Sequence, residues 1–407
     1  MNKIETKAFI QEKFAEYYRL NSVSIDPPSS LANREFAFLL FKERMMLRHK
    51  GVKNAEDLRT LLKTVVPSDV YYSSAYYEKP EEEMEAKGWL GADLVFDIDA
   101  DHIPTPCGKQ HDTWTCNNCG ATGRGVPPEM CPTCKGLKFD DKSWLCDMCL
   151  ESAKRETIKL IDVLTKDFGL SPQEMIVAFS GHRGYHVHVE SQVVQTLDQM
   201  ARKEIVDYMV GIGLEPRFHG LEEGLGPNLE EAGWRGRIAT GMYEFLRNTS
   251  AEQFKKNGLK KSVTNLISQR DKILESWKSK GRPWRTKDIG SESWMKIVQK
   301  AIENQSVKID TVVTTDIHRL IRLTNTLHGK TGLKKINVSI SGIEGFDPLK
   351  EAIAFKEGRI RLVVFEAPEF RLGDERYGPY KKEEVELPTA AALFLMGKNA
   401  AQVKEEH

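Results

Sequence analysis

The sequence lacks cysteine everywhere except in one short segment. All seven cysteines of the 407-residue chain fall between Cys107 and Cys149. An odd number of clustered cysteines would leave one thiol unpaired in a disulfide scaffold, which argues against a secreted, disulfide-held protein. The cysteine pattern therefore favours metal binding in a reducing, cytoplasmic compartment.

The chain also lacks long apolar runs and net charge. Apolar stretches such as 36–41 and 391–396 are core-sized and fall short of the ~18–20 residues that a membrane span needs. Residues 1–7 carry acid and have no apolar core of a signal peptide. The 59 basic and 59 acidic residues balance, so overall charge gives no argument for a nucleic-acid partner. With 40% hydrophobic residues, the composition indicates a soluble globular protein of two or three domains.

Locally, the balance of charge is different. Residues 255–300 hold 13 Lys or Arg against 4 Asp or Glu, with Trp277, Trp284 and Trp294 between them. Such a basic, aromatic stretch can follow a phosphate backbone. It is equally typical of a solvated helical face whose tryptophans are buried, and both interpretations stay open.

The spacing of apolar residues predicts mixed secondary structure. Helices are expected at 3–19, 31–49, after Asn54, at 158–168 and at 192–211. Strands are expected at 70–77, 92–98, 175–179, 187–190, 311–313, 336–340 and 361–365. Glycine-rich loops are expected over 216–237. Strands and helices do not alternate strictly, which favours an α+β fold.

We expect one main domain in three parts, 1–101, 151–243 and 305–407, with a cysteine-rich insertion at 102–150 and a helical insertion at 244–304.

The cysteine-rich insertion is predicted to depend on zinc. Its cysteines form three C-x-x-C pairs, Cys116/Cys119, Cys131/Cys134 and Cys146/Cys149. A C-x-x-C turn presents two thiolates on one side of a loop, as a tetrahedral Zn²⁺ site requires. Cys107 and one histidine, His111 or its competitor His102, bring the total to eight ligands. Eight ligands suit two Zn²⁺ ions, and the segment has too few apolar residues to form a core without them.

An acidic strand directly precedes this insertion. Asp97 and Asp99 are two residues apart in a strand-forming context, so both carboxylates project from one face. A divalent cation would relieve their repulsion, and oxygen ligands favour Mg²⁺ or Mn²⁺. The competing interpretation is a solvated strand end, because the D-x-D pattern is short.

Two further segments carry residues suited to binding phosphates. Ser180-Gly-His-Arg-Gly-Tyr-His186 joins two predicted strands, and its glycines allow close approach of the backbone to a ligand. Arg183 and His186 could contact phosphate there, although a plain hairpin with a surface arginine is also possible.

The second of these segments spans 309–330. Asp310 is expected to head a short strand, and Arg319 and Arg322 are expected to share a helical face. His328 and Lys330 then follow in a turn. This set suits a metal-bound nucleotide polyphosphate.

Taken together, Asp97-Ile-Asp99, Ser180-Gly-x-Arg-Gly-x-His186 and Arg319-Leu-Ile-Arg-x₅-His328-Gly-Lys330 resemble the small, catalytic subunit of the archaeal and eukaryotic type of DNA primase. The motifs match in order and wide spacing over about 30–345. The resemblance implies a primase-type catalytic domain and a nucleotidyltransferase that makes short primers on single-stranded DNA. It also implies a heterodimer with a large subunit, within replication machinery at the nucleoid.

The resemblance further implies a role for each matching residue. Asp97, Asp99 and Asp310 would form a three-carboxylate Mg²⁺ or Mn²⁺ site, with Asp316 as a fallback for Asp310. The incoming nucleoside triphosphate would meet Arg183, His186, Arg322 and His328, with Ser180 and Lys330 as second candidates. The family knuckle would be Cys107, His111, Cys146 and Cys149, and the inserted zinc ribbon would be Cys116, Cys119, Cys131 and Cys134.

Two other functions remain as alternatives. One is a related primase-polymerase of repair or of a mobile element. The other is a non-catalytic zinc-ribbon protein that binds nucleic acid, for which the second and third motifs would be unnecessary.

Overall fold

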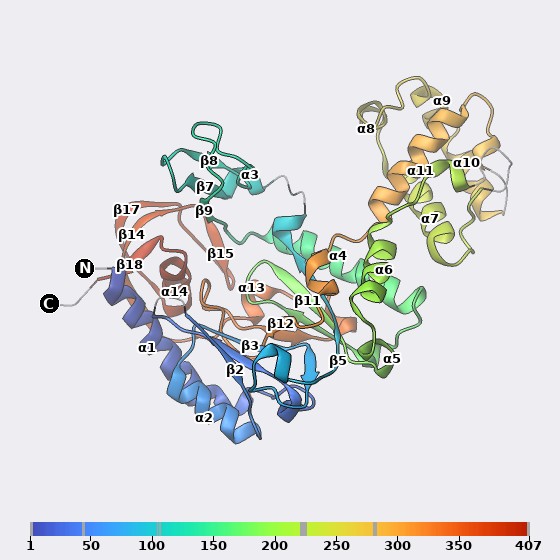
Figure 1. The fold of residues 1–407 in the computed structure, drawn as a ribbon. Coiled ribbons are helices and arrows are strands. Elements are labelled where there is room, and N and C mark those ends of the chain that lie inside the picture. Colours follow the sequence, from blue (N-terminus) through green and yellow to red (C-terminus); the bar gives the residue numbers. More distant parts are fainter. Residues whose placement is uncertain are drawn as a thin grey trace. The chain divides into compact units, whose positions relative to one another are not determined.

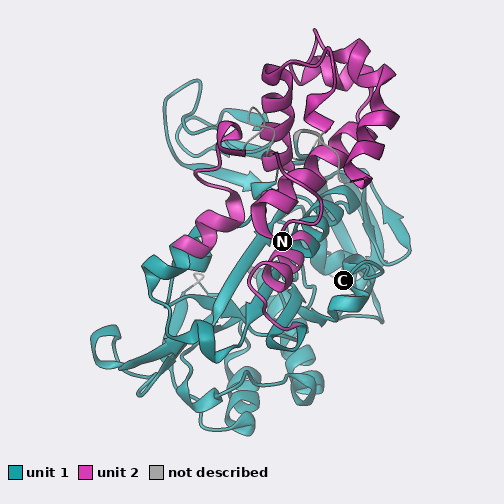
Figure 2. Ribbon diagram, turned by 90° about the vertical axis from the view of Figure 1, so that its right-hand side faces the viewer, with its two compact units in different colours: residues 1–158, 172–203, 309–407 teal, residues 159–171, 204–308 magenta. Residues whose placement is uncertain are grey.

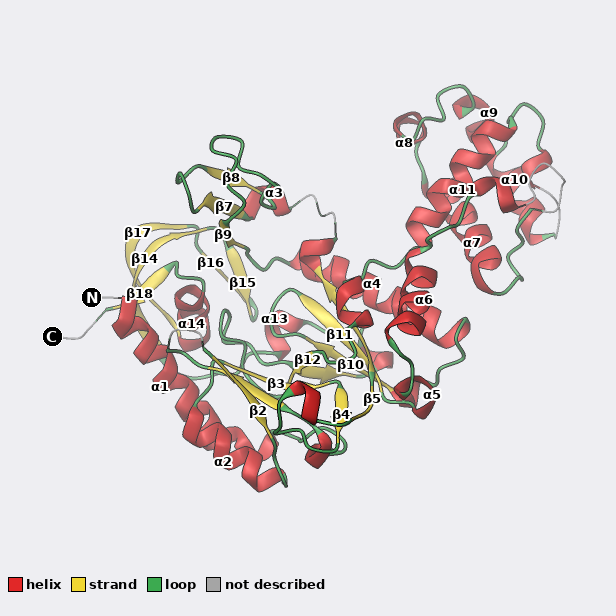
Figure 3. Cartoon of the chain, in the orientation of Figure 1, coloured by secondary structure: helices red, strands yellow, loops and turns green. Residues whose placement is uncertain are grey.

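In a computed structural model, the chain folds into helices and antiparallel sheets (Figures 1 and 3), which confirms the predicted α+β class. The structure describes residues 3–42, 45–103, 105, 107–219, 226–279 and 283–404. Two compact units are distinguished in Figure 2: unit 1 is 1–158, 172–203 and 309–407, and unit 2 is 159–171 and 204–308. Every helix within the described residues is too short or too polar to cross a membrane.

The first four-stranded sheet of unit 1 is antiparallel, with the order β12-β3-β1-β2. Its strands are β1 (Phe36–Leu39), β2 (Met46–Lys50), β3 (Asp69–Ser73) and β12 (Leu320–Arg322). The prediction of a helix over 31–49 was therefore wrong. β1 is an interior strand buried along most of its length, and such a strand has the continuous apolar run that also occurs in a buried helix.

The second four-stranded sheet of unit 1 is also antiparallel, with the order β13-β10-β11-β6. Its strands are β6 (Leu94–Asp99), β10 (Met175–Phe179), β11 (Gly184–Val189) and β13 (Ile336–Val338). The strands predicted in these regions are confirmed to within a few residues. In the pairing of β11 with β6, His186 lies opposite Asp97 and Gly184 opposite Asp99.

Smaller sheets and helices complete unit 1. The remaining strands outside the cysteine-rich segment are β4 (Ala75–Tyr77), β5 (Trp89–Ala92), β14 (Arg359–Ala367), β15 (Phe370–Leu372), β16 (Glu375–Tyr377), β17 (Tyr380–Pro388) and β18 (Ala401–Val403). The helices are α1 (Lys3–Asn21), α2 (Ala55–Val65), α5 (Gln192–Gln195), α12 (Thr311–Thr315), α13 (Pro348–Glu351) and α14 (Thr389–Gly397). Two longer helices, α4 (Asp147–Lys166) and α6 (Gln199–Val210), contain the boundaries between the units. Asn54 caps α2 by accepting hydrogen bonds from the amides of Glu56 and Asp57, as its position in the sequence predicts.

The cysteine-rich segment has little regular structure (Figure 3). It contains the short helix α3 (Gly108–His111) and a three-stranded sheet of order β8-β7-β9. These strands are β7 (Thr113–Cys116), β8 (Thr122–Arg124) and β9 (Phe139–Lys142). The small buried cluster of this segment consists of Trp114, Cys116 and Cys131.

Unit 2 is helical. Its own helices are α7 (Gly233–Asn248), α8 (Ala251–Lys256), α9 (Val263–Ser268), α10 (Arg270–Lys278) and α11 (Ser291–Gln305). The range 244–304, predicted as a helical insertion, lies within this unit. The loop predicted over 216–237 was wrong at its end, because α7 already begins at Gly233. Trp277, Trp284 and Trp294 are buried in one hydrophobic cluster, so these rings pack the core of unit 2.

We predict that Trp294→Ala lowers the stability of unit 2. The side chain is 1% exposed, and truncating a buried tryptophan costs about 3–5 kcal/mol through lost contacts and the cavity left behind. A thermal unfolding scan should show an earlier transition. Ile212→Ala in the same unit is the matched control, because Ile212 is 65% exposed and should leave the scan unchanged. Equal scans for the two variants would contradict the assignment of Trp294 to the core.

Candidate functional site

A cavity of about 190 Å³ in unit 1 is lined by residues of both four-stranded sheets. It collects residues from all three sequence motifs, although these motifs are separated by many residues in the chain. The lining residues are Tyr71, Val95, Asp97, Asp99, Ser180, His182, His186, Val313, Arg319, Leu320, Ile321, Arg322 and His328. This cavity is the candidate active site.

Three carboxylates lie close to one another at this cavity, of which Asp97 and Asp99 line it. Asp97 and Asp99 lie on β6, and the Asp310 amide donates a hydrogen bond of 2.8 Å to the carbonyl oxygen of Asp97. Burial, together with the charges of Asp99 and Asp310, raises the pKa of Asp97 to about 7. The three groups therefore repel one another in the free protein, and a bound divalent cation would remove that repulsion. The oxygen donor set fits Mg²⁺ or Mn²⁺.

The segment around Asp310 forms differently from its prediction. Residues 311–315 form the short helix α12 and not a strand. The Asp310 carboxylate caps this helix by accepting hydrogen bonds from the backbone amides of Val312 and Val313. The expected helix carrying Arg319 and Arg322 was also wrong, since Leu320–Arg322 is strand β12. Asp316 is the C-cap residue of α12, and its carboxylate accepts a hydrogen bond from the His318 backbone amide. Between the two candidates, Asp310 is the carboxylate that the structure brings to Asp97.

Basic and polar residues face these carboxylates. His186 Nε2 lies 3.6 Å from an Asp97 oxygen, and His186 Nδ1 is buried without a hydrogen-bond partner. His328 Nδ1 accepts a hydrogen bond from the Lys330 amide, which leaves the proton on Nε2. The Ser180 hydroxyl oxygen accepts from the amides of His182 and Gly184, so its own hydrogen remains available to a ligand.

Arg322 is held in place by a buried partner that the sequence did not reveal. Its guanidinium donates to Asp69, which is 5% exposed and lies on β3, and its other nitrogen donates to the Tyr71 hydroxyl at 3.3 Å. The same Asp69 carboxylate accepts from the Gly329 amide at 3.0 Å. Burial alone would raise the pKa of Asp69, but the Arg322 charge and the hydrogen bond from the Gly329 amide hold it well below its usual range. Asp69 thus fixes both Arg322 and the turn that carries His328.

Arg183 has other partners than the predicted triphosphate. Its side chain is 1% exposed and forms ion pairs with Asp101 at 2.9 Å and with Asp112 at 3.0 Å. It is not among the residues that line the cavity. A buried guanidinium requires such carboxylates, and Asp112 lies too far along the chain for the motif to indicate it. Lys330 is exposed and belongs to a neighbouring cavity.

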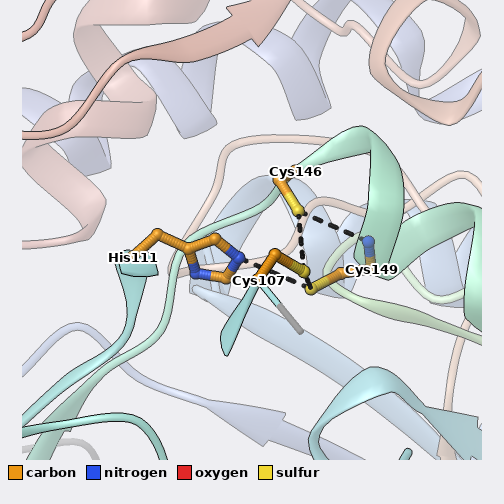
Figure 4. Close-up of side chains that lie close together, drawn as sticks. All are labelled: Cys107, His111, Cys146 and Cys149. Atoms are coloured by element: carbon orange, nitrogen blue, oxygen red, sulfur yellow. Dashed lines mark hydrogen bonds between the residues drawn. The ribbon is translucent and has the colours of Figure 1, made fainter. Parts of the chain in front are cut away.

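Both predicted sets of zinc ligands come together. Figure 4 shows Cys107, His111, Cys146 and Cys149, whose ligand atoms all lie within 4.8 Å of one another. The Cys107–Cys149 and Cys107–Cys146 sulfur distances are 3.2 and 3.5 Å. His111 Nδ1 bonds to the Asp112 carboxylate at 2.7 Å, which directs Nε2 toward the sulfurs, as in many zinc sites. His111, and not His102, completes this cluster.

The second cluster consists of Cys116, Cys119, Cys131 and Cys134. Its sulfur distances are 3.6 Å for Cys116–Cys134 and 3.7 Å for Cys119–Cys131, close to the spacing that ~2.3 Å Zn–S bonds give in a tetrahedron. All seven cysteines are free thiols. The donor sets of both clusters, three sulfurs with one nitrogen and four sulfurs, fit Zn²⁺.

Comparison with known proteins gives the family. A model of the DNA primase small subunit matches residues 137–340. The DNA primase small subunit PriS of Archaeoglobus fulgidus is 36% identical, over 96% of this chain and 97% of its own length. The PriS protein of Nitrosopumilus maritimus is 32% identical, over 99% of this chain and 100% of its own length. That of Methanococcoides burtonii is 33% identical, over 98% of this chain and 99% of its own length. The chain belongs to the DNA primase small subunit family.

Within this primase small subunit, sequence reasoning missed several residues of the site. His182 lines the cavity although only its motif neighbours were proposed as nucleotide ligands, and Tyr71 lines it from another sheet. Arg319, which the sequence placed in the polyphosphate-binding set without a separate role, lines it as well. Residues that adjoin a motif and face the cavity can be identified once the register of the strands is known. Asp69 and Asp112 act from distant segments, so no local spacing could have indicated them.

We predict that Asp69→Asn destabilises the primase small subunit and impairs nucleotide use. The change leaves the buried Arg322 guanidinium without a charged partner, which costs about 3–5 kcal/mol. Thermal unfolding should occur at lower temperature, and KM for nucleotide should rise. Asp374→Asn, which removes only an exposed ion pair with Lys350, should change neither. A normal KM in Asp69→Asn would show that Arg322 needs no fixed partner.

We also predict two Zn²⁺ ions per chain by elemental analysis. Cys116→Ser/Cys119→Ser should retain one, and His111→Ala should lose or weaken the other, because each removes ligands from one cluster only. His102→Ala is the matched control and should keep both ions. One ion or none in the unmodified protein, or two in the double variant, would contradict this ligand assignment.

Proposed function

We propose that this chain synthesises short primers on a single-stranded DNA template by two-metal nucleotidyl transfer. The observation that carries the proposal is one cavity lined both by the carboxylates Asp97 and Asp99 and by basic groups. Asp97, Asp99 and Asp310 would hold Mg²⁺ or Mn²⁺. Two such ions, when bound, supply activation of the attacking 3′-oxygen and neutralise charge on the leaving pyrophosphate.

The remaining residues bind and orient the incoming nucleoside triphosphate. Burial and the nearby Arg322 hold the pKa of His328 well below its usual range, so it is neutral and donates through Nε2. Arg322, paired with Asp69, remains charged and can meet phosphate oxygens. Ser180 and His186 add donors from the turn and from β11. We assign Arg183 a positioning role, through Asp101 and Asp112, in place of direct contact with phosphate.

Two features support a primase over the other candidate functions. A zinc-ribbon protein that only binds nucleic acid would not need a cavity lined by two carboxylates, with a third beside them, and by several basic and polar groups. The family is that of a small subunit, which supports a large-subunit partner that assists initiation. A role in repair or in a mobile element has no specific support in the structure.

The test is primer synthesis on single-stranded DNA with Mg²⁺ or Mn²⁺, supplying ribonucleotides and deoxyribonucleotides separately. We predict that Asp97→Asn or Asp99→Asn lowers the rate at least about 1000-fold, equivalent to about 4 kcal/mol of transition-state stabilisation. Both variants should unfold at or above the normal temperature, because a charge is removed from a repelling group. The exposed Asp374→Asn variant is again the control. Near-normal synthesis by Asp97→Asn would overturn the two-metal mechanism, and no synthesis by the unmodified chain with its partner would overturn the function.

A further inference from the structure

Lys398 lies directly after helix α14, in a part of the chain that none of the three motifs includes. Its side chain is buried, with the whole residue 7% exposed. In the described part of the chain, no carboxylate forms an ion pair with it. Its ammonium group lies 2.7 Å from His182 Nε2. A buried lysine without a paired acid is costly, so its position calls for a functional explanation.

The position of Lys398 is fixed by close packing of the helix end. A Cβ on Gly397 would lie 2.7 Å from the Lys330 carbonyl oxygen, so only glycine allows this approach. Ala391 through Met396 in α14 are all buried, which anchors the helix. Lys398 is therefore held beside the His328–Lys330 turn by the backbone and by the core of the C-terminal segment.

The contact between Lys398 and His182 determines which ring nitrogen of His182 donates a hydrogen bond and which accepts one. When Lys398 is an ammonium group it has only donors, so His182 Nε2 then accepts and Nδ1 carries the proton. The His182 ring stacks on His328, with centroids 4.9 Å apart and planes at 10°. Both histidines line the candidate active site. Lys398 thus sets the tautomer and orientation of a cavity-lining donor.

The surroundings of Lys398 favour an anion. Burial, together with the charges of Lys330 and Arg183, lowers the pKa of Lys398 to about 7. The charges of Asp101 and Asp112 also act on Lys398, but both carboxylates are already paired with Arg183. Lys398 and Lys330 also line a second cavity of about 460 Å³, whose charged lining residues include Lys142, Asp140 and Asp141. A polyphosphate in the candidate active site would relieve this excess of positive charge.

We propose that Lys398 is a positioning residue for the incoming triphosphate, which it serves by holding His182 as an Nδ1–H donor stacked on His328. The inference rests on the proposed function. It adds a residue from outside the motifs to the phosphate-binding part of the site.

The test compares Lys398→Met, Lys398→Arg, His182→Ala and the double variant Lys398→Met/His182→Ala. Lys398→Met should raise KM for nucleotide roughly 10-fold with kcat nearly unchanged, since His182 is no longer held as a donor toward the bound substrate. Lys398→Arg should recover most of the affinity. The double variant should be no worse than the poorer single variant, because Lys398 acts through His182.

A matched control removes a different buried ammonium group. Lys154 is 8% exposed and donates to the carbonyl oxygens of Glu344 and Phe346, so Lys154→Met should lower the unfolding temperature and leave KM unchanged. Direct binding of inorganic pyrophosphate should weaken in Lys398→Met by a similar factor. This binding measurement tests Lys398 even if primer synthesis is absent, so failure of the inference and failure of the proposed function remain distinguishable.

Two results would overturn the inference. One is unchanged KM and unchanged pyrophosphate binding in Lys398→Met, whatever its unfolding temperature. The other is additive losses in the double variant, which would show that Lys398 does not act through His182.

Discussion

The antiparallel pairing of β11 with β6 sets the position of most of the candidate active site. In this register His186 stands opposite Asp97, and Gly184 stands opposite Asp99. A Cβ on Gly184 would lie 2.0 Å from the Ile98 carbonyl oxygen, so the strands can approach this closely only with glycine there. Since side chains alternate along a strand, a slip of one residue would turn His186 and the carboxylates away from each other.

The other side of the cavity depends on charges buried within the first sheet. Asp69 on β3 holds Arg322 on β12 and also the Gly329 amide. The Asp69 carboxylate therefore keeps the buried Arg322 guanidinium charged and also orients the turn that carries His328. A surface arginine would lose most of its electrostatic effect to solvent, whereas this one remains available to a ligand in a low-dielectric setting.

Much of the site was predictable because its chemistry is local in sequence. The C-x-x-C spacing indicated the residues of both cysteine clusters, and the alternation around Asp97 and Asp99 predicted strand β6. Prediction failed where distant contacts decide the structure. The β-branched run after Asp310 favours a strand, yet it forms α12 because the Asp310 side chain caps the helix. Arg183 was expected at the triphosphate, but Asp112 from a distant segment pairs with it.

The placement of the cysteine-rich segment has a consequence for the order of folding. β6 ends at Asp99 and its partner β11 begins at Gly184, so closing this strand pair requires a long intervening loop. Loop closure costs less entropy when part of the loop is already compact. The two cysteine clusters lie inside that loop, and Asp112, next to His111, is joined through Arg183 to Asp101. If the two cysteine clusters bind zinc as proposed, a newly made chain that has acquired the ions would bring β6 and β11 together more readily than one that has not.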